Sequence, residues 1–373
     1  MMKNKKVYTL VSFAIIIALF LNGCGARSDE EIRIGLVCFQ NDISNAYPEM
    51  LTGMEFAAED IERKYNKGNY SVSVEIFNDK GENGNSVILA KKALGNKSID
   101  YIAVMSSDDN LDKAAEILGK GKKVTFWLDD GGHLARGAEY KNQFYLTYDL
   151  GDRAAGLTNY FIKKNVKSLS VLYSAKNANG GIGQALIEEA KAAGINTDSQ
   201  VMLNSFSVDD YKEKLKKDMP DAVAVVTEEP EENIKIIRGV KTVLPDCIVV
   251  TDSYMDNADF LKKNQWLMED VIIPTRIKSD WNKEETDKIG KRYKTLYGKD
   301  IETDWFFHGY YALMELAEAT VNCKTSRADN VNKYLTSSSA GRFHFNNAGI
   351  IMSNDLSVQI VRGGELKKIT EIK

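Results

Sequence analysis

The stretch Ile32-Arg33-Ile34-Gly35-Leu36-Val37 opens the alternation of strands and helices that decides the fold of this 373-residue chain. It is a compact run dominated by residues that favour strands. The next patterned segment, from about Pro48 to Tyr65, has apolar residues at steps of three and four, which is the spacing of one helix face. Pro48 suits a first helical turn, where its missing N–H is not needed. A strand that leads directly into a helix predicts a right-handed βαβ unit.

The alternation continues along the chain in two consecutive series of similar length and order. The first series ends near residue 147 and the second near residue 251. Further strands are predicted at 72–77, 99–104, 124–128, 168–173, 200–204, 222–227 and 247–251, with helices between them. Strands that alternate with helices at this spacing form parallel sheets covered by helices on both faces. The sequence therefore predicts an α/β protein, and its length suggests two lobes rather than one core.

The last part of the chain breaks this alternation. Two helices, at 283–297 and 305–321, lie between short extended segments at 271–275, 341–345, 357–361 and 366–369. This mixture suggests that the chain crosses back and forth and completes each lobe in turn. We predict a first lobe of residues 32–146 and 272–335 and a second lobe of 147–271 and 336–373. A three-stranded hinge would then join them near 143–149, 272–276 and 336–341.

The first residues have the pattern of a secretory signal. Lys3, Lys5 and Lys6 precede an almost unbroken apolar run, Val7 to Leu21, which is shorter than the about 20 residues of a membrane-spanning helix. The run ends in Leu21-Asn22-Gly23-Cys24, which resembles a bacterial lipobox. That resemblance implies a signal peptide of residues 1–23, a lipid on the thiol of Cys24 and a short tether over 24–31. The alternative is an ordinary cleaved signal peptide with an unmodified cysteine.

Composition excludes several classes of function. Hydrophobic residues make up 43% and charged residues 27% of the chain, as in soluble globular proteins. A net charge of -4 without any basic block argues against nucleic-acid binding. The cysteines besides Cys24 are Cys38, Cys247 and Cys323, an odd number in largely apolar contexts, which favours buried thiols over a disulfide framework. The three histidines lie apart from these cysteines, so we predict no metal site.

Four passages together resemble one protein family. They are Thr52–Ile61 (TGMEFAAEDI), Val104–Ser107 (VMSS), Trp305–Leu313 (WFFHGYYAL) and Gly341–Gly349 (GRFHFNNAG). In this order and spacing they resemble the type I periplasmic binding proteins of the branched-chain amino acid family served by ABC importers. The resemblance covers nearly all of residues 31–370. It implies a two-lobed fold that binds a small molecule between its lobes, without a cofactor and without enzymatic activity.

The carboxyl ends of parallel strands predict where such a ligand binds, because helix N-termini converge there. In the family, backbone N–H groups and hydroxyls of the first lobe hold the ligand carboxylate, and Ser106 and Ser107 occupy that position here. A serine pair before a helix is also an ordinary N-terminal cap, and this alternative stays open. The remaining predicted ligand contacts also follow strands or lie near strand ends: Tyr47, Asp129, Asp130, Asn177, Asn179, Glu228 and Asp252.

Two departures from the family bear on the ligand. Trp127-Leu128-Asp129-Asp130 stands where amino-acid-binding members carry a pair of small residues. Asp252 matches the family's acid for the ligand ammonium only after a shift of one residue. Acids around the strand ends favour a ligand with an amine or several hydroxyls over a bare anion. Some of these acids could instead cap helices. Trp127 is among the aromatic residues that could cover an apolar part of the ligand, with packing at the rim as the alternative.

Three functions fit this pattern to different degrees. The first is an extracytoplasmic, lipid-anchored and monomeric protein that delivers a small polar solute to an ABC permease. The second is a sensory version of the same module, read by a membrane receptor. The third is a cell-surface enzyme, against which stands the absence of G-x-S-x-G, G-x-x-x-x-G-K-[ST] and H-E-x-x-H patterns.

The lipobox interpretation predicts the behaviour of a Cys24→Ser variant. Acylation needs the Cys24 thiol, so the variant should carry no lipid and should persist as an uncleaved precursor or be released from the cells. Membrane fractionation with mass spectrometry of the product measures this. A mature-sized, lipid-modified variant in the membrane fraction would contradict the interpretation.

Overall fold

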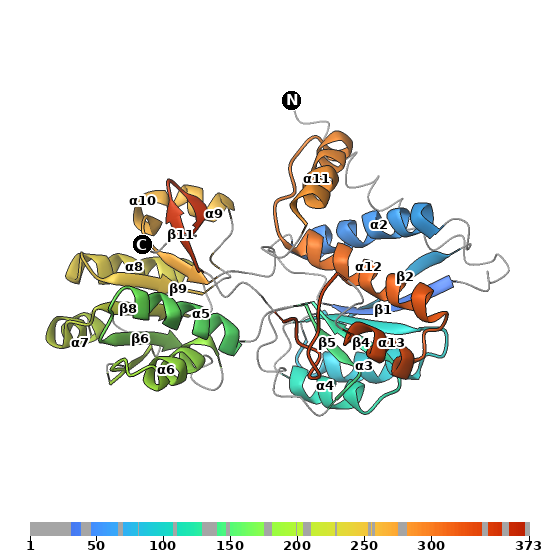
Figure 1. Cartoon of the computed structure of the whole chain (residues 1–373), viewed down its shortest axis with the longest axis horizontal. Helices are drawn as coiled ribbons and strands as arrows, with labels where there is room; N and C mark the ends of the chain where they lie inside the picture. Colours follow the sequence, from blue (N-terminus) through green and yellow to red (C-terminus); the bar gives the residue numbers. More distant parts are fainter. Residues whose placement is uncertain are drawn as a thin grey trace.

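The computed structural model describes the chain in segments that begin at the first predicted strand. These segments are residues 31–38, 46–65, 70–80, 82–106, 110–128, 140–146, 150–174, 181–198, 200–203, 210–227, 230–252, 255, 258–274, 282–337, 342–352 and 358–369. Cys24 and the predicted signal peptide therefore lie outside the described residues. Within them the fold is α/β, with two sheets in two separate lobes (Figure 1).

The sheet of the first lobe has five parallel strands in the order β2-β1-β3-β4-β5. Its strands are β1 (Glu31–Cys38), β2 (Ser71–Asn78), β3 (Tyr101–Met105), β4 (Val124–Trp127) and β5 (Gln143–Tyr145). Helices of this lobe are α2 (Ala46–Tyr65), α3 (Asn85–Gly95), α4 (Leu111–Gly119), α11 (Lys283–Tyr297), α12 (Trp305–Cys323) and α13 (Ala328–Leu335). The predicted parallel sheet is confirmed, and β5, which lies within the predicted hinge passage 143–149, is its fifth strand.

The sheet of the second lobe has seven strands in the order β12-β11-β10-β9-β8-β6-β7. They are β6 (Leu169–Ser174), β7 (Gln200–Leu203), β8 (Ala222–Val226), β9 (Ile248–Thr251), β10 (Ile272–Pro274), β11 (Val358–Arg362) and β12 (Glu365–Lys368). All neighbours pair in parallel except β11, which is antiparallel to both β10 and β12. The helices are α5 (Leu150–Lys163), α6 (Ile182–Ala192), α7 (Asp210–Asp218), α8 (Pro230–Val243), α9 (Ala258–Lys263) and α10 (Gln265–Met268).

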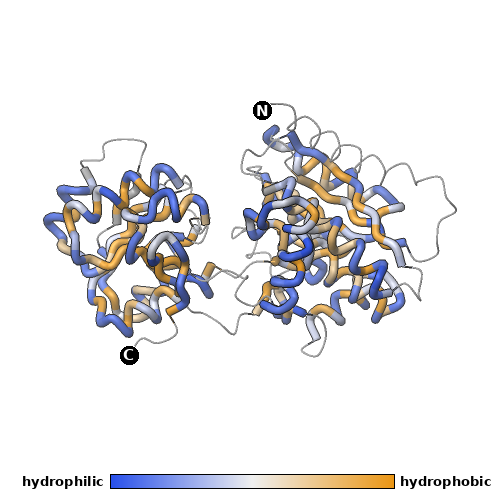
Figure 2. Tube along the Cα trace, turned by 90° about the horizontal axis from the view of Figure 1, so that it is seen from above, coloured by the Kyte–Doolittle hydropathy of each residue, from blue (hydrophilic) through white to orange (hydrophobic). Residues whose placement is uncertain are grey.

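Each sheet has an apolar cluster on both of its faces. Along β1, Ile32, Ile34 and Leu36 join the cluster beneath α2 and α12, whereas Val37 faces the cluster beneath α3 and α4. The second sheet has one cluster with α5 and α6 and another with α7 and α8. The hydropathy of the chain follows this layering, because apolar residues run through the inside of both lobes (Figure 2). Strands buried on two faces explain the nearly continuous apolar runs of the sequence.

The chain changes lobe at three places, and two segments lie on a different side from the predicted division. β10 pairs with β9 and β11 in the seven-stranded sheet, although residues 272–335 were predicted for the first lobe. The segment 342–352 belongs to the first lobe, because Phe343 and Phe345 are buried in its core. The third change of lobe therefore lies between Met352 and Val358, later than the predicted 336–341.

Residues 342–352 form a turn that docks against β5. The amide oxygen of Asn346 accepts the N–H groups of Ala348 and Ile350, at 2.9 and 3.0 Å, and these bonds hold the turn together. Gly349 has a φ of 74°, and a Cβ there would lie 1.8 Å from the carbonyl oxygen of Gln143. Its carbonyl accepts the N–H of Tyr145 at 2.8 Å. This glycine is required both by its backbone conformation and by the close approach to β5.

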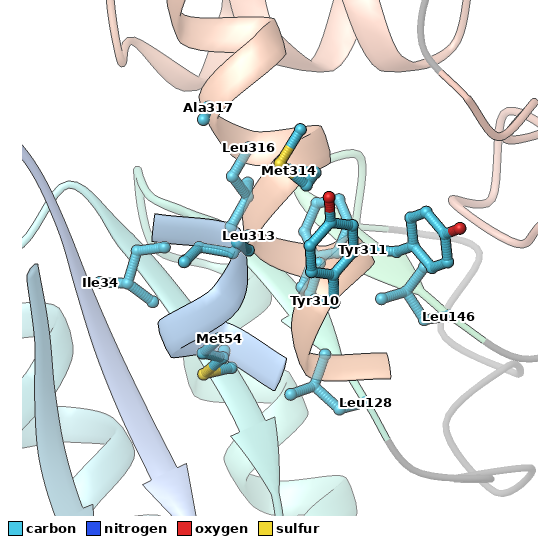
Figure 3. Close-up of a cluster of buried hydrophobic side chains, with 14 of the residues drawn as sticks. Ile34, Met54, Leu128, Leu146, Tyr310, Tyr311, Leu313, Met314, Leu316 and Ala317 are labelled. Carbon is cyan, nitrogen blue, oxygen red and sulfur yellow. The ribbon is translucent and has the colours of Figure 1, made fainter. Parts of the chain in front are cut away.

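The closest helix contact of the first lobe joins α2 and α12, which are far apart in sequence. A Cβ on Gly53 would lie 1.8 Å from the carbonyl oxygen of Phe306, and one on Gly309 would lie 2.2 Å from that of Met50. Both glycines belong to the passages that resemble the family. Around this contact, Met54 of α2 gathers with Leu313 and Leu316 of α12 (Figure 3). The two backbones therefore touch where a side chain would separate them.

Gly53→Ala should destabilise the protein, because the new methyl group meets a backbone carbonyl that cannot move without shifting a helix. We expect a loss of about 1–3 kcal/mol or more, as for other overpacked cores. Gly290→Ala is the matched control, since Gly290 lies in α11 and a Cβ there meets nothing within 4 Å. That change should be neutral or stabilise by up to about 1 kcal/mol. Denaturant unfolding of both variants measures the difference, and equal effects would contradict the close contact.

Candidate functional site

Ser106 and Asp79 meet at the carboxyl edge of the five-stranded sheet. Ser106 follows β3, Asp79 follows β2, and the end of β1 lies between them in the sheet. The hydroxyl of Ser106 donates to the carboxylate of Asp79, and the Asp79 N–H donates to the carbonyl of Cys38 at 2.9 Å. Ser106 is 5% exposed and Asp79 is fully buried. The first lobe therefore presents a serine whose orientation is fixed by a neighbouring acid.

The capping alternative for Ser106 is excluded by the start of α4. That helix begins at Leu111, and Asn110 occupies its N-cap position. Ser106 lies too far upstream to satisfy the first N–H groups of the helix. Its hydroxyl instead joins two loops that leave neighbouring parts of the sheet edge. Ser107 lies outside the described residues.

Tyr47 lies at the start of α2, close to the end of β1. It is 4% exposed and packs in the core cluster of the first lobe. Its hydroxyl forms a hydrogen bond with the thiol of Cys38, and burial raises the pKa of that thiol to about 12. The prediction that Cys38 is buried is confirmed, whereas Cys247 and Cys323 are half-buried. Tyr47 thus packs against the end of β1 through its contact with Cys38.

Asp252 follows β9 in the second lobe and pairs with a buried arginine. Its Oδ1 atom lies 3.2 Å from Nη1 of Arg153, which comes from the first turns of α5. The side chain of Arg153 is 3% exposed and that of Asp252 is 12% exposed. A buried guanidinium needs such a partner, because an uncompensated buried charge is costly. The acid proposed for a ligand ammonium is therefore already bound to a cation, which the sequence did not reveal.

A second polar contact fixes the end of β8. The side-chain oxygen of Asn233 in α8 accepts both the N–H and the hydroxyl of Thr227, each at 3.0 Å. Both residues are fully buried. This contact therefore fixes the residue that directly follows β8. Neither Thr227 nor Asn233 was predicted, because a threonine after a strand and an asparagine in a helix are common.

Trp127 packs in the core, which decides between the two alternatives that the sequence left open for it, cover for a ligand and packing. It is fully buried, stacks on Tyr145 and donates its indole N–H to the side-chain oxygen of Gln143 at 3.0 Å. The Tyr145 hydroxyl donates to the same oxygen at 2.9 Å. This polar contact explains how two large amphipathic rings are buried on the neighbouring strands β4 and β5, of which β5 is the edge of the sheet.

Six other predicted ligand contacts cannot be located. Ser107, Asp129, Asp130, Asn177, Asn179 and Glu228 lie outside the described residues. Of the predicted set, the structure therefore places Ser106 and Tyr47 in the first lobe and Asp252 in the second. In the described part of the chain, no group of three or more His, Cys, Asp or Glu residues could hold a metal ion. No helix there is long and apolar enough to cross a membrane.

Comparisons with known proteins agree with this architecture. Residues 31–346 match the family model described as periplasmic binding protein. A substrate-binding protein of an ABC transporter from Desulfitobacterium hafniense, solved with leucine, superposes with a TM-score of 0.75 at 16% identity, covering 91% of this chain and 100% of that one. A leucine-binding protein from Thermotoga maritima gives 0.71 at 16% identity, covering 90% and 97%.

A third solved structure carries a different kind of ligand. It is a solute-binding protein of an ABC transporter from R. palustris in complex with benzoate, with a TM-score of 0.68, 12% identity and coverage of 91% and 95%. At these low sequence identities, the similarity to the three structures shows a shared fold and no more. A search of the curated proteins found no match.

Ser106→Ala distinguishes a ligand contact from a purely structural serine. If its hydroxyl meets a charged or buried group of the ligand, affinity should fall by about 1–3 kcal/mol, roughly five- to hundredfold. A serine that only supports Asp79 would lower stability while affinity stayed nearly constant. Calorimetric titration and unfolding of the same variant measure both quantities. The control is Ser170→Ala, because Ser170 is also buried but lies near the amino end of β6, away from the carboxyl edge of its sheet. Unchanged affinity in Ser106→Ala, Asp130→Asn and Asp252→Asn together would remove this site from consideration.

Proposed function

The chain belongs to the periplasmic binding protein family, and from that premise we propose that it is an extracytoplasmic solute-binding protein anchored by a lipid on Cys24. It captures a small polar ligand between its two lobes and delivers that ligand to an ABC importer. The protein acts as a binding module and not as an enzyme. Its membrane partner is the permease of the importer.

One observation carries this proposal: each lobe has buried polar residues at the carboxyl ends of its parallel strands. Asp79 and Ser106 mark that edge in the first lobe, and Asp252 with Arg153 marks it in the second. Open α/β sheets bind their ligands at this edge, where loops and helix N-termini offer unpaired N–H groups. Since the chain changes lobe only a few times, the lobes can move about a hinge and close on a ligand.

The ligand we propose is an amino acid or a related polar metabolite with an amine. The carboxylate of Asp79 stands at the strand edge of the first lobe, and the predicted acids Asp129, Asp130 and Glu228 follow strands β4 and β8 in the sequence. Such an edge favours a ligand with a cationic or hydroxyl group over a simple anion. The buried Arg153 beside Asp252 adds a cation whose charge the acid already balances, so this pair does not turn the edge into an anion site.

A thermal-shift screen of the purified protein tests this function. The screen compares amino acids, polyamines, sugars, nucleosides and aromatic acids such as benzoate. At a concentration of ~100 times Kd, a ligand adds about 2.7 kcal/mol of stability and should raise the melting temperature by several degrees. We expect the largest shift from an amine-bearing compound. A shift from benzoate and none from amines would contradict the proposed ligand class.

Small-angle scattering then tests the closing of the lobes. A ligand that binds between them shifts an open–closed equilibrium by its preference for the closed form. The radius of gyration should fall when the compound found in the screen is added at saturation. Identical scattering curves with and without that compound would count against a closing motion.

A further inference from the structure

Glu315 is an acid in the middle of the most buried helix of the first lobe. Its side chain is fully buried, and so are its neighbours Leu313, Met314 and Leu316 in α12. Oε1 accepts the backbone N–H of Arg342 at 2.7 Å. Among the described residues, Oε2 has no hydrogen-bond partner. An ionised carboxylate in such a place would lack most of the donors that it needs.

Among the described residues, the two cations near Glu315 are already paired with other carboxylates. Arg342 reaches Glu285 of α11 at 2.5 Å and Glu318 of α12 at 3.2 Å. Lys64 of α2 reaches Glu318 at 2.6 Å. The two cations are thus already paired with two carboxylates, and a third carboxylate would give the cluster a net negative charge at its most buried point. A neutral Glu315 balances the cluster.

Two tyrosines of α12, Tyr310 and Tyr311, also face this cluster. Arg342 lies over the ring of Tyr311, and the hydroxyl of Tyr311 donates to Glu285 at 3.2 Å. Burial, with the charge of Asp60, raises the pKa of Tyr310, and burial, with the charge of Glu285, raises that of Tyr311. Both phenols therefore stay neutral over the range in which carboxyls titrate. For Glu315 itself, burial raises the pKa to about 8, opposed by the N–H and charge of Arg342 and by Lys64.

We propose that the Glu315 carboxyl carries a proton in the folded protein at neutral pH, and that this proton couples pH to the docking of residues 342–352. The geometry of that segment supports the coupling. Arg342, whose N–H bonds to Glu315, is its first residue, and Phe343 and Phe345 follow into the core. Gly349 then bonds to Tyr145 of β5. The segment is the last part of the first lobe before the chain enters β11 of the second.

The sign of the pH effect follows from the raised pKa. In the folded protein Glu315 holds its proton up to about pH 8. In the unfolded chain the carboxyl loses this proton near its ordinary pKa of 4.5. The folded state therefore binds one more proton between these values, so the contribution of Glu315 to stability is full below pH 4.5 and is lost as the pH rises. Within the window, a one-proton difference raises the unfolding equilibrium constant up to about tenfold per pH unit.

Glu315→Gln tests the proposal, because glutamine keeps the shape of the neutral carboxyl and cannot ionise. Denaturant unfolding of the purified protein is measured from pH 5 to pH 9. The ratio of the wild-type unfolding constant to that of the variant should rise by up to about tenfold per pH unit toward pH 8. Glu116→Gln is the control: it removes an exposed carboxylate that pairs with Lys120 in α4, outside the Glu315 cluster, and should leave the steep dependence from Glu315 in place.

Two further measurements keep the proposal testable if the glutamine variant folds poorly. The carboxyl carbon of Glu315, followed by NMR in wild-type protein labelled at glutamate, should titrate well above pH 6. Hydrogen exchange of residues 342–352, corrected for the intrinsic rate, should speed up from pH 6 to pH 9 more than that of β8. A Glu315 signal that titrates below pH 5, or unfolding constants of wild type and Glu315→Gln that keep the same ratio at every pH, would overturn it.

Discussion

The backbones of α2 and α12 touch at Gly53 and Gly309, and much of the architecture depends on this contact. It brings residues 305–323, which follow the whole second sheet in sequence, back onto the first sheet. The chain must therefore leave the first lobe, complete most of the second and return. The last strands, β11 and β12, then have to cross once more to finish the second sheet. A discontinuous pair of lobes joined by several chain passages follows from one close helix contact.

The two-lobed arrangement also brings together the polar residues that are buried at the strand edges, so that each can form a hydrogen bond or an ion pair. At the strand edges each described polar residue has a specific partner: Ser106 has Asp79, Thr227 has Asn233 and Asp252 has Arg153. Buried polar groups with complete partners are rigid, because breaking one contact leaves the other group unsatisfied. A rigid edge in each lobe presents its loops in a fixed orientation. We infer that closure of the lobes, and not rearrangement within a lobe, brings the two halves of the proposed site together.

Much of the fold could be predicted from the sequence, because strands buried on both faces are continuous apolar runs and the helices between them have a clear period. The exceptions have physical causes. β5 lies within the predicted hinge passage 143–149, but its three residues, Gln143–Tyr145, are too few to show that it joins the first sheet. Residues 342–352 lie in the first lobe because of tertiary contacts between Phe345 and the rings of Phe126 and Phe144, which no local pattern encodes. The sequence could not decide between ligand cover and packing for Trp127, because its hydrogen-bond partner Gln143 lies on another strand. The Arg153–Asp252 pair was missed for the same reason, since its members are 99 positions apart.

The buried acids Asp79, Asp252 and Glu315 show why burial alone does not identify a binding site. Asp79 and Asp252 lie at strand edges and contact a hydroxyl and a guanidinium, groups that hold a carboxylate in one orientation. Glu315 lies within a helix, and its described hydrogen bond comes from a backbone N–H. A carboxylate without a cation pays the full cost of leaving water, so it is more stable with a proton. The acids at the edges therefore suit recognition of a polar ligand, whereas the acid in α12 suits only a response to pH.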